Sequence, residues 1–446
     1  MFNCFKELAV RASELKLCFY CSNSLPASNQ EHIFNASWAG SHQTKKLICN
    51  ECNQSFSEGV DEAFLIYTRA IMNAWSFKGK RHQSIPIIRI LEGNYLIEAG
   101  AKLKLKEPLV EEETQPNGQI KLKISFNSSE QAKHWLKDPG AESYFGRALS
   151  QEERDEIIRQ AKFQSEDAQP QKALANLNLQ EQYRSAAHTI LKCLGFFIPD
   201  LVCHEQTKEV REFSRYDRGD WSLFAVEVEQ KFSLADQVVS LLGLGVHHNS
   251  VEIYWCSHLR MVIGVVTILN RVKRAVVIAK DYSGPDRILY VFEDTHGSGK
   301  PPHAILAEIN SQEFSLPIIE IQDFASQTRI VQVFRNELSG LTTIDYPRDA
   351  LTAKLKKTIQ DVNEISVEVD EKMIQKYREA FLDLFTNWGK VLGKSIDLDK
   401  VLSKMSDYEF ETLTHRFTGR NCRDKEFESS VAEIFKNLLN EFECSG

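Results

Sequence analysis

Two close pairs of cysteines have the clearest chemical meaning in this sequence. Cys18 and Cys21 form one Cys-x-x-Cys pair, and Cys49 and Cys52 form a second. Four thiolates are a usual ligand set for structural zinc, which prefers tetrahedral coordination. Zinc binding would supply much of the folding free energy of such a short polar segment, on the order of 10 kcal/mol. We therefore expect Zn²⁺ at these four cysteines; coincidental core cysteines are the alternative.

Three further side chains near the cysteines could hydrolyse a phosphodiester bond. Glu31 and His32 lie between the two pairs, and Asn53 follows Cys52 directly. A histidine can take a proton from water near neutral pH, so His32 can be the general base. Carboxylate and amide oxygens suit Mg²⁺ or Mn²⁺, so Glu31 and Asn53 can hold a catalytic ion. The alternative for His32 is a core histidine in a non-catalytic zinc knuckle.

A helix must position Asn53 opposite the Glu31-His32 pair. Apolar residues recur at helical spacing between residues 53 and 73, which predicts a helix that begins at the second cysteine pair. Its apolar face would carry Phe56, Val60, Phe64 and Tyr67. Zinc would then hold the start of this helix against the strand that carries His32. A basic run, KGKR at residues 78–81, follows.

This CxxC…EHI…CxxCN stretch resembles the HNH endonuclease family with a zinc-braced ββα-metal finger, and it is similar in motif order to phage endonuclease VII. The resemblance covers about residues 15–90 and implies zinc on the four cysteines, His32 as general base, and catalytic Mg²⁺ or Mn²⁺ on Glu31 and Asn53. Thr44 occupies the position where the family usually carries an asparagine that orients the base. The stretch also resembles bacterial HNH proteins, several of them tied to defence against phage or mobile elements.

Length and charge favour a multidomain protein. A chain of 446 residues is too long for one core, and about three domains are expected. The net charge is −8, but residues 1–90 hold ten Lys or Arg against seven Asp or Glu, a net of +3. A mildly basic module on an acidic body fits local contact with nucleic acid. The six cysteines outside the pairs are scattered singly, which is typical of a reducing compartment.

The overall prediction is an α+β multidomain fold. It begins with a ββα-metal zinc finger, continues with a β-rich middle and ends with a helical C-terminal region. The predicted domains are an HNH nuclease domain at 1–84, a small β-rich and helical region at 85–170, an α+β domain with a β-rich core at 171–348, and the helical region at 349–446.

Apolar patterns predict the elements of these domains. A helix is expected at 5–17, a hairpin turn at Asn117-Gly118 and an acidic, Gln-rich linker at 163–173. Further strands are predicted at 85–91, 94–100, 101–106, 119–126, 222–230, 250–257, 261–269, 274–280, 287–293 and 329–334, and further helices within 128–165, 177–194, 235–242, 351–362, 372–392, 397–405 and 429–442.

Weaker patterns elsewhere have simpler explanations. Asp220, Glu229 and Lys231 follow the D…ExK order of restriction-type nucleases, but a strand that ends in charged residues explains them equally well. His42 could contact substrate, although a surface histidine is the simpler interpretation. Isolated residues and turns explain the remaining candidates, which are Cys203-His204, the group His247, His248, Cys256 and His258, and the loops SGPD and GSGK.

The expected function is therefore metal-dependent hydrolysis of DNA, with RNA not excluded as substrate. The competing hypothesis is a non-catalytic zinc-knuckle protein that binds nucleic acid or a partner. We expect a soluble cytoplasmic protein without membrane spans and an effector role in phage or mobile-element defence. One finger cuts one strand, which favours a homodimer, and the C-terminal regions would bind a regulatory ligand or partner protein.

Overall fold

The protein is described from a computed structural model. It describes residues 2–7, 15–79, 85–89, 94–162, 178–228, 247–296, 302–309, 318–320, 327–339, 341, 349–351, 354, 368–392, 410–421 and 424–444. The chain divides into two compact units. The first contains residues 1–64, 79–82 and 179–446, and the second contains residues 65–78 and 83–178. The predicted domain boundaries at 84, 170 and 348 stay predictions.

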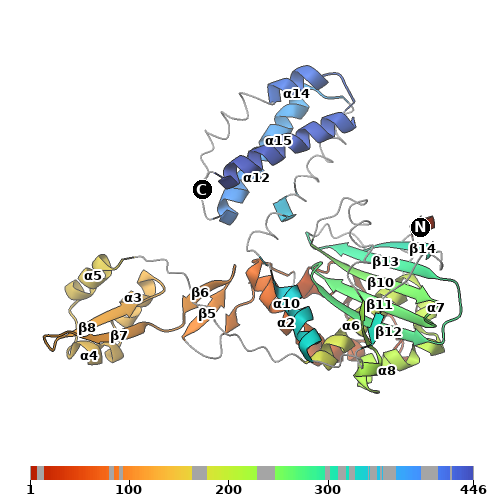
Figure 1. The fold of residues 1–446 in the computed structure, drawn as a ribbon, viewed down its shortest axis with the longest axis horizontal. Helices are drawn as coiled ribbons and strands as arrows, with labels where there is room; N and C mark the ends of the chain where they lie inside the picture. The colour runs from red at the N-terminus through yellow and green to blue at the C-terminus, as the bar shows by residue number, and fades with distance from the viewer. Residues whose placement is uncertain are drawn as a thin grey trace. The chain divides into compact units, whose positions relative to one another are not determined.

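The first unit is built on an antiparallel sheet (Figure 1). Among the described residues it has eight strands in the order β1-β14-β13-β10-β11-β12-β9-β15. The long central strands are rich in Val, Ile and aromatic residues, which favour strands. The strands are β1 (Phe2–Glu7), β9 (Ala225–Val228), β10 (His248–Cys256), β11 (Met261–Ile268), β12 (Val272–Lys280), β13 (Arg287–Asp294), β14 (His303–Ile309) and β15 (Ile318–Glu320).

Helix α6 (Leu179–Phe197) packs across strands β10, β11 and β12. Gly264 of β11 permits this close approach, because a Cβ atom there would lie 2.5 Å from Cγ2 of Ile190. Nearly the whole length of α6, from Gln182 to Phe196, is buried. The helix is followed by α7 (Pro199–Val202), η3 (Glu205–Thr207), α8 (Lys208–Tyr216) and η4 (Trp221–Leu223).

The cysteine-rich stretch folds as two short strands followed by a helical segment. Strands β2 (Glu31–His32) and β3 (Gln43–Thr44) are antiparallel. The predicted helix is present, and all four residues of its predicted apolar face are buried. One turn of π-helix interrupts it, a feature that often marks functional sites. The remaining elements are η1 (Ala36–Trp38), α1 (Asn50–Ser55), the π-turn η2 (Phe56–Val60) and α2 (Asp61–Ala74).

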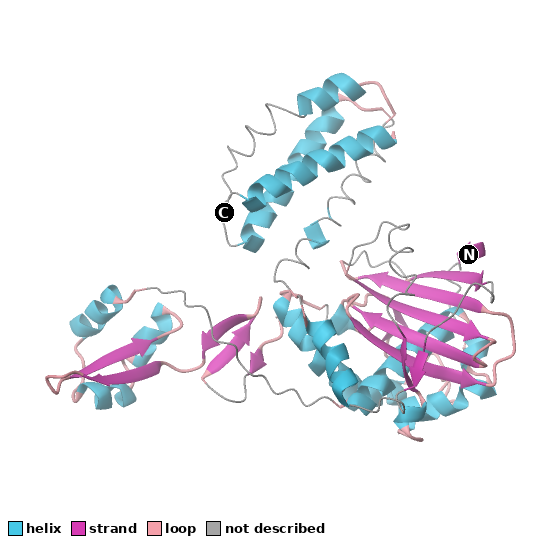
Figure 2. Cartoon of the chain, viewed as in Figure 1, coloured by secondary structure: helices cyan, strands magenta, loops and turns pink. Residues whose placement is uncertain are grey.

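The described residues of the second unit form short strands, three small helices and the C-terminal part of α2, and Figure 2 distinguishes helices from strands by colour. The predicted turn at Asn117-Gly118 is confirmed, since Gly118 has a φ of +79° between two paired strands. The elements are β4 (Ile88–Arg89), β5 (Tyr95–Glu98), β6 (Lys102–Leu105), β7 (Leu109–Thr114), β8 (Ile120–Ser125), α3 (Ser129–Trp135), α4 (Pro139–Phe145) and α5 (Gln151–Gln160).

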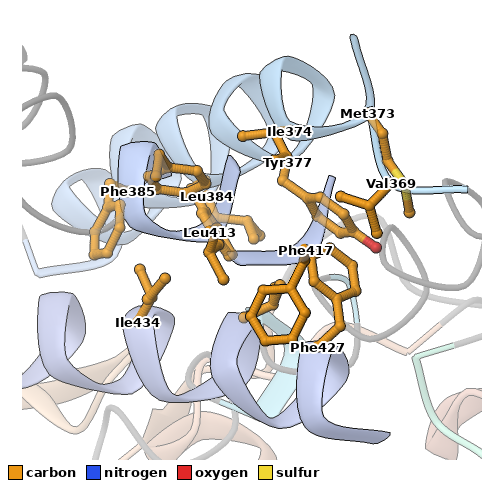
Figure 3. Packing of buried hydrophobic residues seen from close by; sticks show 13 residues of the cluster. Val369, Met373, Ile374, Tyr377, Leu384, Phe385, Leu413, Phe417, Phe427 and Ile434 are labelled. Atoms are coloured by element: carbon orange, nitrogen blue, oxygen red, sulfur yellow. The ribbon is translucent and has the colours of Figure 1, made fainter. Parts of the chain in front are cut away.

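The C-terminal region is helical, as predicted, and has its own apolar core (Figure 3). Aromatic residues dominate this core, and Tyr377 and Phe417 both lie beside Phe427 in edge-on contacts. Tyr377, Phe381 and Phe385 are buried in this core. The described helices are α12 (Glu371–Leu392), α14 (Phe410–Phe417) and α15 (Lys425–Cys444).

Two predictions of secondary structure are wrong. Residues 5–7, where the helix predicted at 5–17 would begin, belong to strand β1, because the edge of β14 supplies partners for their backbone. Residues 329–334 lie within helix α10 (Gln327–Leu338) rather than a strand. Arg271 donates to the carbonyl oxygens of Glu337 and Asn336 at the end of this helix, a distant contact that sequence periodicity cannot show.

The fold is mixed α+β, as predicted. No helix in the described part of the chain is long and apolar enough to cross a membrane. The predicted linker at 163–173 and the helix at 235–242 lie outside the described residues.

Candidate nuclease centre

The four paired cysteines come together at one point. Their sulfur atoms all lie within 4.8 Å of one another. Cys21 Sγ is 3.4 Å from Cys49 Sγ and 3.6 Å from Cys52 Sγ. Sulfurs around a tetrahedral zinc ion are about 3.8 Å apart, given Zn–S bonds of about 2.3 Å. The cluster could therefore hold a metal ion such as zinc.

The pKa values of these thiols also indicate that a cation would stabilise the cluster. A hydrogen bond from the Cys52 thiol lowers the pKa of Cys18 to about 5, despite the opposing effect of burial. Burial raises the pKa of Cys21 to about 11, and the pKa of Cys52 is also raised, chiefly by its hydrogen bond to Cys18. One thiolate thus disfavours the next, and a divalent cation would be needed to hold all of them ionised.

Helix α8 braces the two cysteine turns. Arg211 Nη1 donates to the carbonyl oxygen of Phe19 at 2.6 Å. Arg215 Nη1 donates to Ser55 Oγ at 2.6 Å, and a further hydrogen bond to Cys52 raises the pKa of its guanidinium against the effect of burial. Two positive charges therefore lie beside a cluster that carries negative charge when its thiols ionise.

The candidate base His32 lies on the strand pair between the cysteine turns. Glu31 is paired with Thr44, and His32 is paired with Gln43. Gln43 Nε2 lies 2.6 Å from His32 Nε2. An amide nitrogen can only donate, so Gln43 donates to the lone pair of His32 Nε2, and the proton of the neutral ring then lies on Nδ1.

Asn53 lies beside the same strand. Cys49 is the N-cap of α1, and Cys52 and Asn53 follow within its first turn. Asn53 Nδ2 donates to the carbonyl oxygen of Gln30, the residue before Glu31, at 3.4 Å. The cysteine cluster and this contact together close the helix onto β2. The three predicted residues Glu31, His32 and Asn53 therefore belong to one small ββα unit.

Comparison with known protein families identifies the segment that contains these residues. Residues 18–66 match the family model of HNH endonucleases. This segment is an HNH endonuclease domain. The match includes both cysteine turns, the Glu31-His32 strand and Asn53. No curated protein and no solved structure matches the chain.

The match to HNH endonucleases implies that this domain binds a nucleic-acid substrate. Its acidic residue Glu31 does not face open solvent. Lys192 Nζ donates to Glu31 Oε1 at 2.6 Å and to the carbonyl oxygen of His32 at 2.8 Å. Burial raises the pKa of Glu31, but Lys192 and His188 outweigh this effect and lower the pKa to about 2. Glu31 is therefore ionised across the working range of an enzyme.

His188 forms a second buried contact between α6 and the HNH domain. Its ring stacks on Phe56 of the π-turn, with centroids 3.6 Å apart and planes 7° apart. Its Nδ1 lies 3.0 Å from the Tyr20 hydroxyl, and its Nε2 lies 3.8 Å from Glu31 Oε1. Burial lowers the pKa of His188, which favours the neutral ring. His188 thus packs the centre without adding positive charge near neutral pH.

The loop between β2 and β3 docks the HNH domain on the sheet. Glu293 of β13 accepts hydrogen bonds from the backbone N–H groups of Ser41 and His42, at 2.6 and 3.1 Å. Asn249 Nδ2 of β10 donates to the carbonyl oxygen of Trp38 at 2.7 Å. The ring of His42 lies edge-on to Phe196, 5.1 Å away, so it is half-buried rather than a surface histidine.

Reasoning from sequence missed Lys192, His188 and Gln43. Lys192 and His188 lie one turn apart on α6, where a buried Lys among apolar residues was a weak signal. Gln43 directly precedes Thr44, the position that was compared with the family asparagine.

The weaker candidates form no second centre in the described part of the chain. Asp220 accepts from the N–H of Ser222 and caps a short helix, and Glu229 and Lys231 lie outside the described residues. His204 likewise caps η3. His247 and His296 contact the same carboxylate oxygen of Asp349, at 3.0 and 2.8 Å. Among the described residues, the four-cysteine cluster is the one group of three or more His, Cys, Asp or Glu side chains that could hold a metal ion.

Proposed function

We propose that this protein is an endonuclease that hydrolyses DNA phosphodiester bonds with Mg²⁺ or Mn²⁺. The observation that supports it most is the contact between Asn53 and the carbonyl oxygen of Gln30, which brings both parts of the predicted site together. A cysteine cluster that served binding alone would not need a carboxylate, an imidazole and an amide on facing elements.

His32 is the proposed general base. The hydrogen bond from the Gln43 amide nitrogen to His32 Nε2 holds the ring in place, and Nε2 is the ring atom that would accept a proton once water takes the place of the amide. The donation from Lys192 to the His32 carbonyl oxygen fixes the backbone of the same residue. Both contacts hold the base in one orientation before substrate arrives, which lowers the entropic cost of reaching the transition state.

Glu31 and Asn53 fit a hard divalent ion, because they offer a carboxylate and an amide oxygen. The amide nitrogen of Asn53 is committed to Gln30, which leaves its Oδ1 as the ligand atom. When bound, Mg²⁺ or Mn²⁺ would stabilise the negative charge that develops on the phosphate. Zinc on the four cysteines would hold Asn53 and the Glu31-His32 strand in register without taking part in the reaction.

The test is cleavage of supercoiled plasmid by purified protein with Mn²⁺ or Mg²⁺, beside the His32→Ala variant. We expect nicked or linear plasmid from the wild type and a loss of about a hundredfold or more in the variant, a usual contribution of a general base. Zinc content and melting temperature should be the same in both. The exposed residue Lys45 provides a matched control, and Lys45→Ala should leave the centre intact.

Single-stranded DNA and RNA are tested in parallel, because a finger of this type can attack either backbone. Wild-type protein that leaves plasmid, linear DNA, single strands and RNA intact would favour the competing hypothesis, a zinc knuckle that only binds. Binding without cleavage in a gel-shift assay would then support that role directly.

The proposed setting is the cytoplasm, in defence against phage or mobile elements, and it rests on the family resemblance alone. The remaining domains would bind a regulatory ligand or partner protein. A homodimer would place two fingers on opposite strands. Sedimentation with and without DNA tests the oligomeric state.

A further inference from the structure

Lys192 is a buried charge in the wall of the nuclease centre. Its side chain is 2% exposed, and its ammonium contacts Glu31 Oε1 and the His32 carbonyl oxygen. Two adjacent residues of the proposed centre therefore share one donor from α6. Burial of an ammonium without a hydrogen-bond acceptor costs free energy, so Lys192 must be paired with acceptors at this position.

The contact leaves Glu31 with two unlike oxygens. In the described part of the chain, Lys192 and His188 both approach Oε1, and no donor contacts Oε2. Neutral His188 adds no charge, so Lys192 is the cation that neutralises the carboxylate. A divalent metal on Oε2 would then share one unit of negative charge with an ammonium ion on Oε1.

Two effects of Lys192 on metal binding oppose each other. Holding Glu31 in one rotamer favours binding, because less side-chain entropy is lost. Repulsion between an ammonium and a doubly charged ion on the same carboxylate disfavours it. With the reduced screening of a buried site, we take the repulsion to be the larger effect.

We propose that Lys192 keeps the metal affinity of the free enzyme low, so that the catalytic ion is bound together with the substrate phosphate. Lys192 positions Glu31 and His32. Its ammonium also competes with the metal for the Glu31 carboxylate. The substrate phosphate adds negative charge at the site, which offsets the positive charge of Lys192. This inference rests on the proposed function, because it takes Glu31 as a metal ligand.

The test measures Mn²⁺ binding to zinc-loaded protein without nucleic acid, by the loss of free Mn²⁺ signal in electron paramagnetic resonance. Lys192→Met should bind Mn²⁺ at least about tenfold more tightly than the wild type, because the repulsion is gone. Lys192→Arg, which keeps the charge, should retain the weak affinity. Lys208→Met is the matched control, since Lys208 is an exposed lysine paired with Glu205, and it should change nothing.

A second pair of variants excludes a general effect of charge. In the Glu31→Gln background, Lys192→Met should give no gain in affinity, because the shared carboxylate is absent. Lys192→Gln keeps a neutral donor and serves if the Met variant fails to fold, as judged by zinc content and circular dichroism. It should also bind Mn²⁺ more tightly than the wild type.

Coupling to the substrate is measured in the His32→Ala background, where DNA stays uncleaved. DNA should tighten Mn²⁺ binding more when Lys192 is present than when it is Met. Equal Mn²⁺ affinity of wild type and both neutral variants overturns the inference, as does a gain that persists in Glu31→Gln. Failure of the wild type to cleave any nucleic acid, with the Mn²⁺ results as expected, overturns the proposed function instead.

Discussion

Glu31 and Lys192 are separated by 161 residues in sequence, yet their charged atoms lie 2.6 Å apart. The pair links the β2 strand of the HNH domain to the long helix α6, which also packs on the sheet. The nuclease centre is therefore part of the larger unit and is not a finger joined to it by a linker.

This pair gives stability a defined dependence on pH. The pKa of Glu31 is about 2, below its ordinary value of 4.5, so the folded protein favours the ionised form. The contribution is complete above the unfolded pKa and is lost as pH falls through the folded value. We expect the free energy of unfolding to fall between about pH 5 and pH 2 more steeply in the wild type than in Glu31→Gln. Urea denaturation at a series of pH values measures both slopes, and parallel slopes would contradict the prediction.

Removal of metal should unfold the HNH domain. Each structural zinc contributes on the order of 10 kcal/mol to folding in small zinc modules, so Cys18→Ser should abolish stoichiometric zinc and any cleavage. Atomic absorption measures the zinc, and limited proteolysis reports the opening of residues near the cysteine turns. Cys203→Ser is the control, because that cysteine is exposed and is not one of the four clustered cysteines. Full protection from protease in the metal-free Cys18→Ser protein would refute a structural role.

Gln43 should be needed to orient the base. Loss of its contact to His32 frees the imidazole, and Gln43→Ala should lower the cleavage rate constant by about 10- to 100-fold, the range seen when partners of a functional histidine are removed. Substrate affinity should stay near the wild-type value, so the loss falls on kcat. Gln43→Asn shortens the side chain and should recover less than full activity. If Gln43→Ala cleaves DNA as fast as the wild type, Gln43 has no role in the mechanism.

The packing of α6 on the sheet predicts a strong effect at Gly264. The added Cβ of Gly264→Ala would overlap Ile190, so we expect a loss of about 1–3 kcal/mol in unfolding free energy. Gly59→Ala is the matched control, because nothing lies within 4 Å of its added carbon. The double variant with Ile190→Ala should be less damaging than the sum of the single changes, since the two sites are in contact. Thermal denaturation measures the three variants, and strictly additive effects of the two single substitutions would argue against this packing.

Local patterns in the sequence predicted the parts of the centre that are local in space. The cysteine turns, the strand of His32 and the helical face from Phe56 onward each depend on neighbours within a few residues. The same reasoning failed for residues 5–7 and 329–334, where pairing with β14 and capping by Arg271 decide the outcome. A single sequence does not show which distant strand or side chain will contact a given segment in the fold.

The contacts of Lys192 illustrate this limit most clearly. A lysine on an apolar helix usually extends its charge to solvent, and nothing near Lys192 in sequence identifies Glu31 as its partner. Gln43 differs, because it lies inside the motif. Its role follows from strand register, and a shift of one residue between Gln43 and Thr44 decides which side chain meets the base.

The position of α6 in the chain also determines when the nuclease centre can be completed during synthesis. At about 5–20 residues per second, the ribosome needs roughly 10–30 s to travel from Glu31 to Lys192. During that interval the nascent HNH domain has its cysteines and His32 but lacks the counter-ion of Glu31 and the ring that covers Phe56. The centre can be completed only after the helix that buries it has left the ribosome.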